Sequence, residues 1–334
     1  MDVLCLGILI ADIFASPIDS LPAAGELRLV DRYLLSAGGC AVNTAACLRR
    51  LGQEVGVIGK VGNDMFGDFV LADLKRLGIN ASSVRRSTTH PTSNTYIVNV
   101  KGEDRRYLHC LGANADISLA DVDLSAFEGS RALYFGGYVV MPGFQPSDLV
   151  QLFREAKGRG LITILDVVIG AGTPVSIEWV EQVLSYTDLF LPNNDEAQAL
   201  TGRKAPQEQA EVFARFNPNC TIAITLGHEG ALVRQRGEVW RAQTYPVQSV
   251  DESGAGDAFT AGFITAMLER WPLEQTLQFA SAMGASCTRA LGCIDSVFHF
   301  DEALAFIAKN RLEISTVPLK VKQAQSEGDV KLRV

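Results

Sequence analysis

The chain has 334 residues, of which 47% are apolar and 20% are charged, so it can bury a large core and is not expected to be disordered. Its formal net charge at pH 7 is −8, and it has no block rich in Lys or Arg, which excludes the electrostatic footprint of a general nucleic-acid-binding protein. No apolar run approaches the length of a membrane span, so we expect no membrane partner.

The first apolar run, VLCLGILIA at residues 3–11, has no basic leader and is followed by Asp12. This pattern predicts a buried strand and not a signal peptide. The seven cysteines include no CxxC pair, and most of them lie in apolar segments, where a thiol behaves as a small apolar side chain. We therefore expect reduced thiols and a cytoplasmic location.

Strand-like runs then alternate with helical patterns along the chain. The runs are VGVIGKVG at 55, ALYFGG at 132, LITILDV at 161, DLFLPN at 188 and TIAITLG at 221. Between the first two, Phe66, Val70 and Leu74 fall on one helical face, and Gly78 is expected to end that helix. The alternation predicts an α/β fold: a doubly wound, mostly parallel sheet with helices on both faces.

Two stretches interrupt this alternation. Residues 13–37 contain Pro17, Pro22 and Gly25, and residues 92–111 form a pattern of two strands joined by a turn over 101–104. Together they predict a small β-sheet lid beside the strand ends, where it would cover a ligand. Because an exposed sheet can pair with a second copy, we also consider a homodimer through this lid.

Paired glycines precede the first expected helix, in SAGGCAVNTAACLRRLG. Gly38 and Gly39 would allow a ligand to approach the backbone closely, and Asn43 in the first turn offers both a donor and an acceptor to a polyol. Taken alone, however, a Gly-Gly turn before a helix is more often structural than ligand-binding.

The segment LPNNDEAQALTG places Asn193 and Glu196 three residues apart at a junction between a strand and a helix. An amide and a carboxylate on one helix face can hold a hydrated Mg²⁺ through its water ligands. The alternative is a capping box, with Asn193 as the N-cap and Glu196 as its partner.

The segment ITLGHEGALV reads as a strand, a glycine turn and a second strand. Thr225 and Gly227 would therefore lie at a carboxyl end of the sheet, where nucleotides bind in open α/β folds. We expect His228 to be a solvated loop residue.

The segment VDESGAGDAFTAGF at residues 250–263 leads into a helix. Phe259 and Phe263 begin a repeat at helical spacing, which predicts a helix over about residues 256–270. The small residues Gly254, Ala255 and Gly256 lie at its N-terminus, where free backbone N–H groups and the helix dipole favour an anion. The pattern predicts a phosphate site.

Asp257 follows this turn directly. A carboxylate beside a bound phosphoryl group would repel it unless the carboxylate has a task, such as accepting the proton of a hydroxyl nucleophile. The alternative is an ordinary helix start with an acidic residue in its first turn.

The four segments GGCAVNTA, NNDE, TLGHEG and DESGAGD in this order make the chain resemble the ribokinase-like, or PfkB, family of carbohydrate and nucleoside kinases. The resemblance extends from Asp12 to about residue 310. It implies a ribokinase-like kinase domain over residues 1–312, with lid segments at about 13–37 and 92–111, and a polar tail at 313–334. It also implies ATP-dependent transfer of the γ-phosphoryl group to a primary hydroxyl of a sugar or sugar-like substrate.

The resemblance also implies a role for each matched residue. Asp257 would be the general base, and the amides of Gly254, Ala255 and Gly256 would stabilise charge on the γ-phosphoryl group. The sugar would be held by Asp12, Gly38, Gly39 and Asn43.

The remaining implied roles concern ATP and metal ions. Thr225 and Gly227 would contact ATP, while Asn193 and Glu196 would place Mg²⁺ through water. Many family members also bind a monovalent cation such as K⁺, and the residues that would hold it here are Asp251, the carbonyl of Ser253, Gly292 and Ser296.

Two residues depart from the family pattern. Glu252 stands where the family usually has a small hydroxyl residue, and we expect its carboxylate to turn outward. Cys40 stands where ribokinase itself has a lysine facing its sugar, which weakens the case for free ribose.

Other functions stay open at this stage. One is a nucleoside kinase of the same family, and another is a non-catalytic regulator that binds a sugar or nucleotide, although the intact segment 254–257 argues against loss of catalysis. A dinucleotide-dependent oxidoreductase is disfavoured because no GxGxxG follows the first strand.

Overall fold

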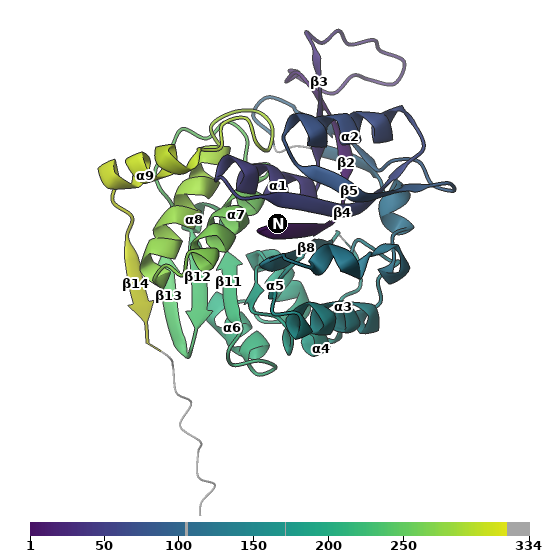
Figure 1. The fold of residues 1–334 in the computed structure, drawn as a ribbon. Helices are drawn as coiled ribbons and strands as arrows, with labels where there is room; N and C mark the ends of the chain where they lie inside the picture. The colour runs from purple at the N-terminus through teal and green to yellow at the C-terminus, as the bar shows by residue number, and fades with distance from the viewer. Residues whose placement is uncertain (104–105, 171, 319–334) are drawn as a thin grey trace, which may run out of the picture.

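A ten-stranded sheet forms the body of the protein in the computed structural model, which describes residues 1–103, 106–170 and 172–318 (Figure 1). The strand order is β14-β13-β12-β11-β10-β9-β8-β1-β4-β5. The parallel strands are β1 (Val3–Gly7), β4 (Val55–Gly62), β5 (Asn80–Ser87), β8 (Ala132–Tyr138), β9 (Ile162–Val167), β10 (Leu189–Phe190) and β11 (Thr221–Thr225). The antiparallel edge consists of β12 (Ala231–Gln235), β13 (Glu238–Ala242) and β14 (Ile314–Val317).

Helices cover both faces of this sheet (Figure 1). One face packs against α1 (Cys40–Arg50), α2 (Met65–Arg76), α7 (Ala255–Leu268), α8 (Leu273–Cys287) and α9 (Phe300–Lys309). The other face packs against α3 (Pro146–Gly158), α4 (Glu181–Leu184), α5 (Asn194–Thr201) and α6 (Pro206–Ala214). Short 3₁₀ helices occur at η1 (Gly112–Ala115), η2 (Leu119–Asp121), η3 (Leu124–Phe127), η4 (Ile177–Trp179) and η5 (Gly227–Glu229).

The first strand shows why the apolar runs are continuous. Val3 and Cys5 of β1 lie in the core beneath α1 and α7, whereas Leu4 and Leu6 lie in the core on the opposite face. A strand buried on both faces needs apolar side chains at every position, and each large one stabilises the fold by roughly 1.5–3 kcal/mol. The predicted doubly wound, mostly parallel sheet is therefore confirmed.

The order of the strands also locates the functional face. From β1 the chain builds outward through β4 and β5 on one side, and then through β8 to β11 on the other. In such sheets the strand order reverses at a switch point, and ligands bind outside the carboxyl ends of the strands there. The switch point lies between β1 and β8, which are adjacent and parallel.

The predicted small sheet is also present, with strand order β3-β2-β6-β7. Its strands are β2 (Ile10–Ala15), β3 (Tyr33–Gly38), β6 (Asn94–Val98) and β7 (Arg106–Cys110). The two interrupting stretches thus join in one sheet, because β2 pairs in parallel with β6. The sheet begins at Ile10, slightly before the expected boundary, and residues 104–105 of the expected turn lie outside the described residues.

The segment expected to be a polar tail begins with a strand. Residues 314–317 form β14 and pair with β13, with Ile314 and Val317 packed against the cores on opposite faces of the sheet. The polar composition of the segment concealed these two apolar contacts. Residues 319–334 lie outside the described part of the chain.

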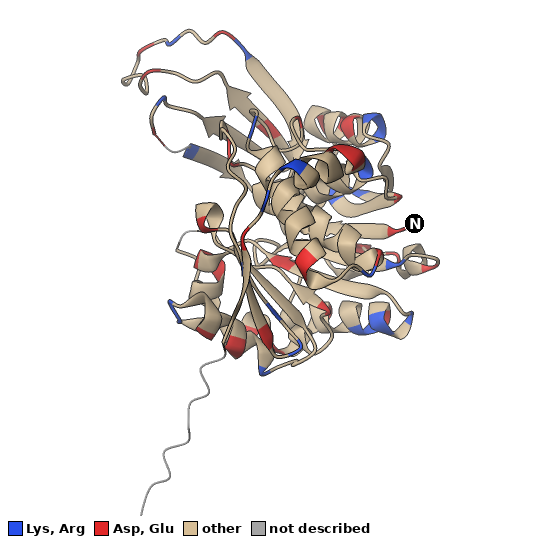
Figure 2. Cartoon of the chain, turned by 90° about the vertical axis from the view of Figure 1, so that its left-hand side faces the viewer, with Lys and Arg blue, Asp and Glu red and all other residues tan. Residues whose placement is uncertain are grey.

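Figure 2 shows basic and acidic residues interspersed over the elements of the chain. All seven cysteines are free thiols. Within residues 1–103, 106–170 and 172–318, no helix combines the length and apolar character that crossing a membrane requires.

Candidate active site

The start of α7 provides a site suited to an anion. Gly254 adopts φ 76° before the helix, and a Cβ at this position would lie 2.6 Å from the Cβ of Cys293, so only glycine fits. A Cβ on Gly256 would meet no heavy atom within 4 Å, which leaves open space beside the first turn. The N–H of Ala255 donates a long hydrogen bond of 3.3 Å to the carbonyl of Glu252. Backbone N–H groups and the helix dipole make this turn favourable for a phosphate.

A cavity of about 460 Å³ opens next to this turn. Its wall includes the sequence-predicted nucleotide residues Thr225 and Gly227, as well as Asn193, Ala255 and Gly256. Asn193 and Thr225 are brought together by a bridge between the segments that follow β10 and end β11. The structure therefore gathers these segments around one space.

Glu252 is exposed but belongs to the wall of the same cavity. The residue is thus solvent-accessible at the edge of the cavity, and the outward turn of its carboxylate stays a prediction.

Asp257 lies between this anion-binding turn and Asn43. The Nδ2 of Asn43 donates to Oδ2 of Asp257 at 2.9 Å, although α1 and α7 are far apart in sequence. Burial, with a smaller contribution from the negative charge of Asp12, raises the pKa of Asp257 to about 6, whereas the hydrogen bond from Asn43 opposes the shift. A carboxylate with such a pKa can accept a proton near neutral pH.

Asp12 is 7% exposed and lies on β2 of the small sheet, directly against the glycine pair. A Cβ on Gly38 would lie 2.0 Å from Oδ2 of Asp12 and 3.8 Å from Oδ1 of Asn43. Gly39 has φ 90°, and a Cβ there would lie 2.4 Å from the carbonyl oxygen of Ile8. The four predicted sugar residues thus form one group beside Asp257. Glycine is required at position 39, and at position 38 it leaves room for the carboxylate of Asp12.

Two residues in register with Asp12 were missed by the sequence analysis. Asp12 pairs with Thr95 on β6, and Thr95 pairs with His109 on β7, so the three residues lie in register across three strands of the small sheet. The Oγ1 of Thr95 lies 3.0 Å from Nδ1 of His109. Burial raises the pKa of Asp12 to about 6, while the hydroxyl of Thr95 lowers it. Only the register of the paired strands reveals that these three residues lie in one row.

Asn43 is buried, and one end of its amide is without a partner. Its Nδ2 bonds Asp257, but its Oδ1 has no hydrogen-bond partner among the described residues. A buried acceptor in this state costs free energy unless a ligand or water supplies a donor. A hydroxyl of a bound polyol would satisfy it.

Asn193 and Glu196 form the capping box that was one of the two alternatives. Glu196 Oε2 accepts from the backbone N–H of Asn193 at 2.8 Å, and Asn193 Oδ1 accepts from that of Glu196 at 2.9 Å. Burial raises the pKa of Glu196 to about 7, with smaller contributions from the charges of Asp195 and Asp257. The cap therefore presents a carboxylate whose charge is poorly compensated by the protein.

Asp166, at the carboxyl end of β9, is a further acidic residue that the sequence analysis did not select. It accepts a 2.7 Å hydrogen bond from the hydroxyl of Tyr134. Cys40, Asp166 and Asp257 each offer a ligand atom within 4.8 Å of the other two. Burial raises the pKa of both Asp166 and Cys40 well above their usual values. In the sequence, Asp166 is the acidic residue near the end of the apolar run LITILDV, and this position could have indicated a site residue.

The four residues expected to bind a monovalent cation also lie together. Asp251 accepts from the N–H of Ser253 at 2.9 Å and from the N–H of Gly292 at 3.1 Å. Cys287 links the other two, because its thiol donates to the carbonyl of Ser253 at 3.2 Å and its carbonyl accepts from Ser296 Oγ at 2.9 Å. The cluster is rich in oxygen and adjoins the start of α7.

This architecture is that of the ribokinase-like kinases. A solved structure of ribokinase from Arabidopsis thaliana, complexed with ribose and ATP, aligns with 92% of this chain and 98% of its own, with a TM-score of 0.77 and 25% identity. The profile of pfkB family carbohydrate kinases matches residues 1–299. The chain therefore belongs to the pfkB family of carbohydrate kinases.

The names of the relatives agree on the class of reaction but differ in substrate. The chain is 27% identical over 288 residues to the ribokinase of Haemophilus influenzae, covering 85% of this chain and 91% of the relative. It is 26% identical over 309 residues to a 5-dehydro-2-deoxygluconokinase of Clostridium perfringens, covering 89% and 90%. The protein is a sugar kinase, and similar identities to kinases of different sugars do not select one acceptor.

Proposed function

We propose that the protein transfers the γ-phosphoryl group of ATP to a primary hydroxyl of a sugar or sugar-like substrate, with Asp257 as the general base. The observation that carries this proposal is the position of Asp257 between the N-terminus of α7 and the group formed by Asp12 and Asn43. An acceptor hydroxyl held by that group would lie between the base and the phosphoryl site.

In the proposed reaction, ATP occupies the cavity beside Thr225 and Gly227, with its γ-phosphoryl group at the start of α7. Asp257 takes the proton of the acceptor hydroxyl as the new O–P bond forms and the bond to the leaving ADP oxygen breaks. The amides of Gly254, Ala255 and Gly256 would stabilise the charge on the transferring group. Asp12, Gly38, Gly39 and Asn43 would orient the sugar.

The residues present suit the metal ions of such a reaction. The carboxylate of Glu196 and the side chain of Asn193 fit a hydrated Mg²⁺, which supplies positive charge against the phosphates when bound. The oxygen-rich cluster of Asp251, Ser253, Gly292 and Ser296 fits K⁺ as a further part of this proposal.

The small sheet is proposed to close over the sugar and exclude water from the phosphoryl group. Its outer face also supports a homodimer. One row of residues in register across the four strands is apolar and consists of Leu35, Ile13, Tyr96 and Leu108. Of these, Leu108 is 71% exposed. Burying such a row of apolar side chains against a second copy would be favourable.

A coupled assay of ADP release over sugars, sugar acids and nucleosides tests the proposed function. We expect turnover with one or a few sugars or sugar acids and none without an acceptor. Turnover only with nucleosides would favour the nucleoside-kinase alternative. Binding of sugar and ATP without any turnover would favour the non-catalytic regulator and refute the proposal.

The proposed metal role of Glu196 predicts a specific phenotype for Glu196→Gln. The Mg²⁺ concentration needed for half-maximal rate should rise about tenfold, because the variant loses charge near the metal but can keep its cap hydrogen bond. The sugar KM should change much less. Asp195→Asn, at the exposed neighbouring position, is the matched control and should change the Mg²⁺ dependence much less, because Asp195 acts on Glu196 only through its charge. An unaltered dependence in Glu196→Gln would leave only the capping role.

The raised pKa of Asp257 predicts the acid limb of the pH profile. The base works only when ionised, so kcat/KM should fall as the pH drops through about 6 and should be retained above it. Asp12 and Glu196 titrate in the same region, so the measured value belongs to the group of carboxylates. Initial rates between about pH 5 and 9 test this. A flat profile down to pH 5 would refute it.

A further inference from the structure

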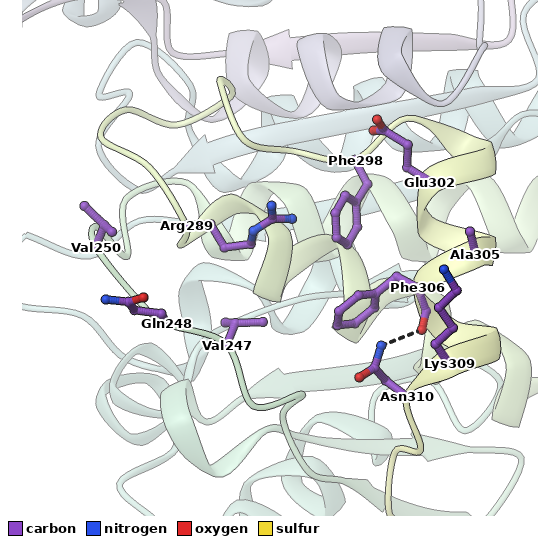
Figure 3. Close-up of a pocket in the computed structure, with 10 residues that line it drawn as sticks. All are labelled: Val247, Gln248, Val250, Arg289, Phe298, Glu302, Ala305, Phe306, Lys309 and Asn310. Atoms are coloured by element: carbon purple, nitrogen blue, oxygen red, sulfur yellow. Dashed lines mark hydrogen bonds between the residues drawn. The ribbon is translucent and has the colours of Figure 1, made fainter.

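A second pocket of about 720 Å³ lies outside the site described above, between the segment at residues 247–250 and one face of α9 (Figure 3). Two phenylalanines, Phe298 and Phe306, are part of its apolar lining, and their ring centroids lie 5.1 Å apart. Two cations, Arg289 and Lys309, also line it. In the view of Figure 3 the two rings lie between these cations.

The described lining of this pocket carries more positive than negative charge. The guanidinium of Arg289 lies 5.0 Å from the centroid of the Phe298 ring, and neither Arg289 nor Lys309 forms an ion pair with another described residue. Glu302 is the acidic residue of the lining, and its carboxylate accepts from the N–H of His299 at 2.8 Å to cap α9. Two cations beside apolar rings favour an anionic ligand.

We propose that this pocket binds a small organic anion that carries a flat apolar ring, and that its binding changes the affinity of the nucleotide cavity. The ring packs against Phe306 and Val247, and the anionic group pairs with Arg289. Lys309 adds longer-range attraction. A carboxylate, phosphate or sulfonate attached to an aromatic ring has this chemistry.

The two cavities share a wall, which provides the route for coupling. Val247 lines both of them. Tyr245 lines the nucleotide cavity, and its ring centroid lies 5.0 Å from that of Phe306 in the second pocket. A ligand that moves Phe306 or Val247 would therefore shift side chains that a nucleotide contacts.

The backbone makes a second connection between the cavities. Thr288 lines the nucleotide cavity, and the next residue, Arg289, lines the second pocket. The carbonyl of Thr288 accepts from the N–H of Val250 at 2.7 Å and from that of Asp251 at 3.1 Å. These bonds fix the segment that leads into the anion-binding turn. An anion drawn to Arg289 would thus act on the stretch of chain that positions Gly254.

Calorimetric titration of phenyl phosphate into the protein saturated with a non-hydrolysable ATP analogue tests the proposal, because the phosphate site at α7 is then filled. We expect saturable binding with a Kd near or below about 1 mM, and weaker binding of inorganic phosphate, which has no ring. Arg289→Gln should raise the Kd about tenfold and Lys309→Met about threefold. Lys75→Met, in the last turn of α2, is the charge-matched control and should bind as wild type does.

The coupling is measured by titrating the ATP analogue with and without saturating phenyl phosphate. A change of at least about threefold in its Kd is expected, and by linkage the analogue should change the Kd of phenyl phosphate by the same factor. The proposal is overturned if the nucleotide-saturated protein shows no saturable binding, or if Arg289→Gln and Lys309→Met both bind as tightly as wild type. Equal affinity of the analogue in both titrations would overturn the coupling.

Discussion

Asp257→Asn is expected to lower kcat on the true acceptor by roughly 10² to 10⁴, the loss typical of removing a general base. The amide has nearly the same shape and can still bond Asn43, but it cannot take the proton of the acceptor hydroxyl. ATP binding should change little, because the anion-binding turn is built from backbone groups. Steady-state rates together with direct titration of ATP separate the two effects.

A matched control comes from the same helix. Glu269 is exposed at the far end of α7, so Glu269→Gln removes one negative charge without reaching the site and should keep full activity. Near-normal kcat in Asp257→Asn would mean that another group takes the proton. Asp166, which lies within reach of Asp257 and whose pKa is also raised by burial, would then be the next residue to test.

The same substitution should stabilise the fold at neutral pH. The pKa of Asp257 is raised from 3.8 to about 6, so the folded protein favours the protonated carboxyl group. The stability that this protonated form contributes is lost as the pH rises through about 6. The amide in Asp257→Asn would carry no charge to repel Asp12, so the free energy of unfolding should rise by about 1–2 kcal/mol. Thermal unfolding at pH 7.5 should show this gain, and it should shrink below about pH 4.

The parts of the site that sequence could predict are those encoded over short distances. The turn at Gly254 and the start of α7 follow from the glycines and the helical repeat after them. The spacing of Asn193 and Glu196 gave both a cap and a metal role as alternatives, and the structure contains the cap. The alternation of strands and helices was enough to predict the doubly wound sheet, because buried parallel strands must be apolar throughout.

The parts that sequence could not predict depend on pairing between distant strands. Thr95 lies beside Asp12, and His109 beside Thr95, only through the register of β2, β6 and β7, and a shift of one residue would turn them to the other face. The strand β14 was missed for a similar reason, since its apolar residues lie within a polar segment. Local composition does not determine with which strand such a segment pairs.

The substitution of Asp12 tests the sugar-binding side of the site. Asp12→Ala should raise the KM for the sugar by about a hundredfold, because a buried charged acceptor would no longer meet the substrate hydroxyls. The affinity for ATP should be unchanged, since Asp12 does not line the nucleotide cavity. Thr95→Val should give a smaller rise in KM, because it removes only the hydroxyl that interacts with the carboxylate of Asp12.

The control and the lid experiment belong to the same test. Asp31→Ala removes an exposed acidic residue from the loop of the lid and should leave the sugar KM unchanged. In the wild type, hydrogen exchange at residues 10–38 and 92–103 should slow when the sugar binds, because closure of the lid over Asp12 protects the strands that carry it. In Asp12→Ala the same protection should need a far higher sugar concentration. Unaltered exchange in both segments, together with an unaltered sugar KM in Asp12→Ala, would show that the sugar binds elsewhere. If a sugar contacts the buried carboxylate of Asp12 beneath a closing sheet, the exchange rates and the KM cannot both stay unchanged.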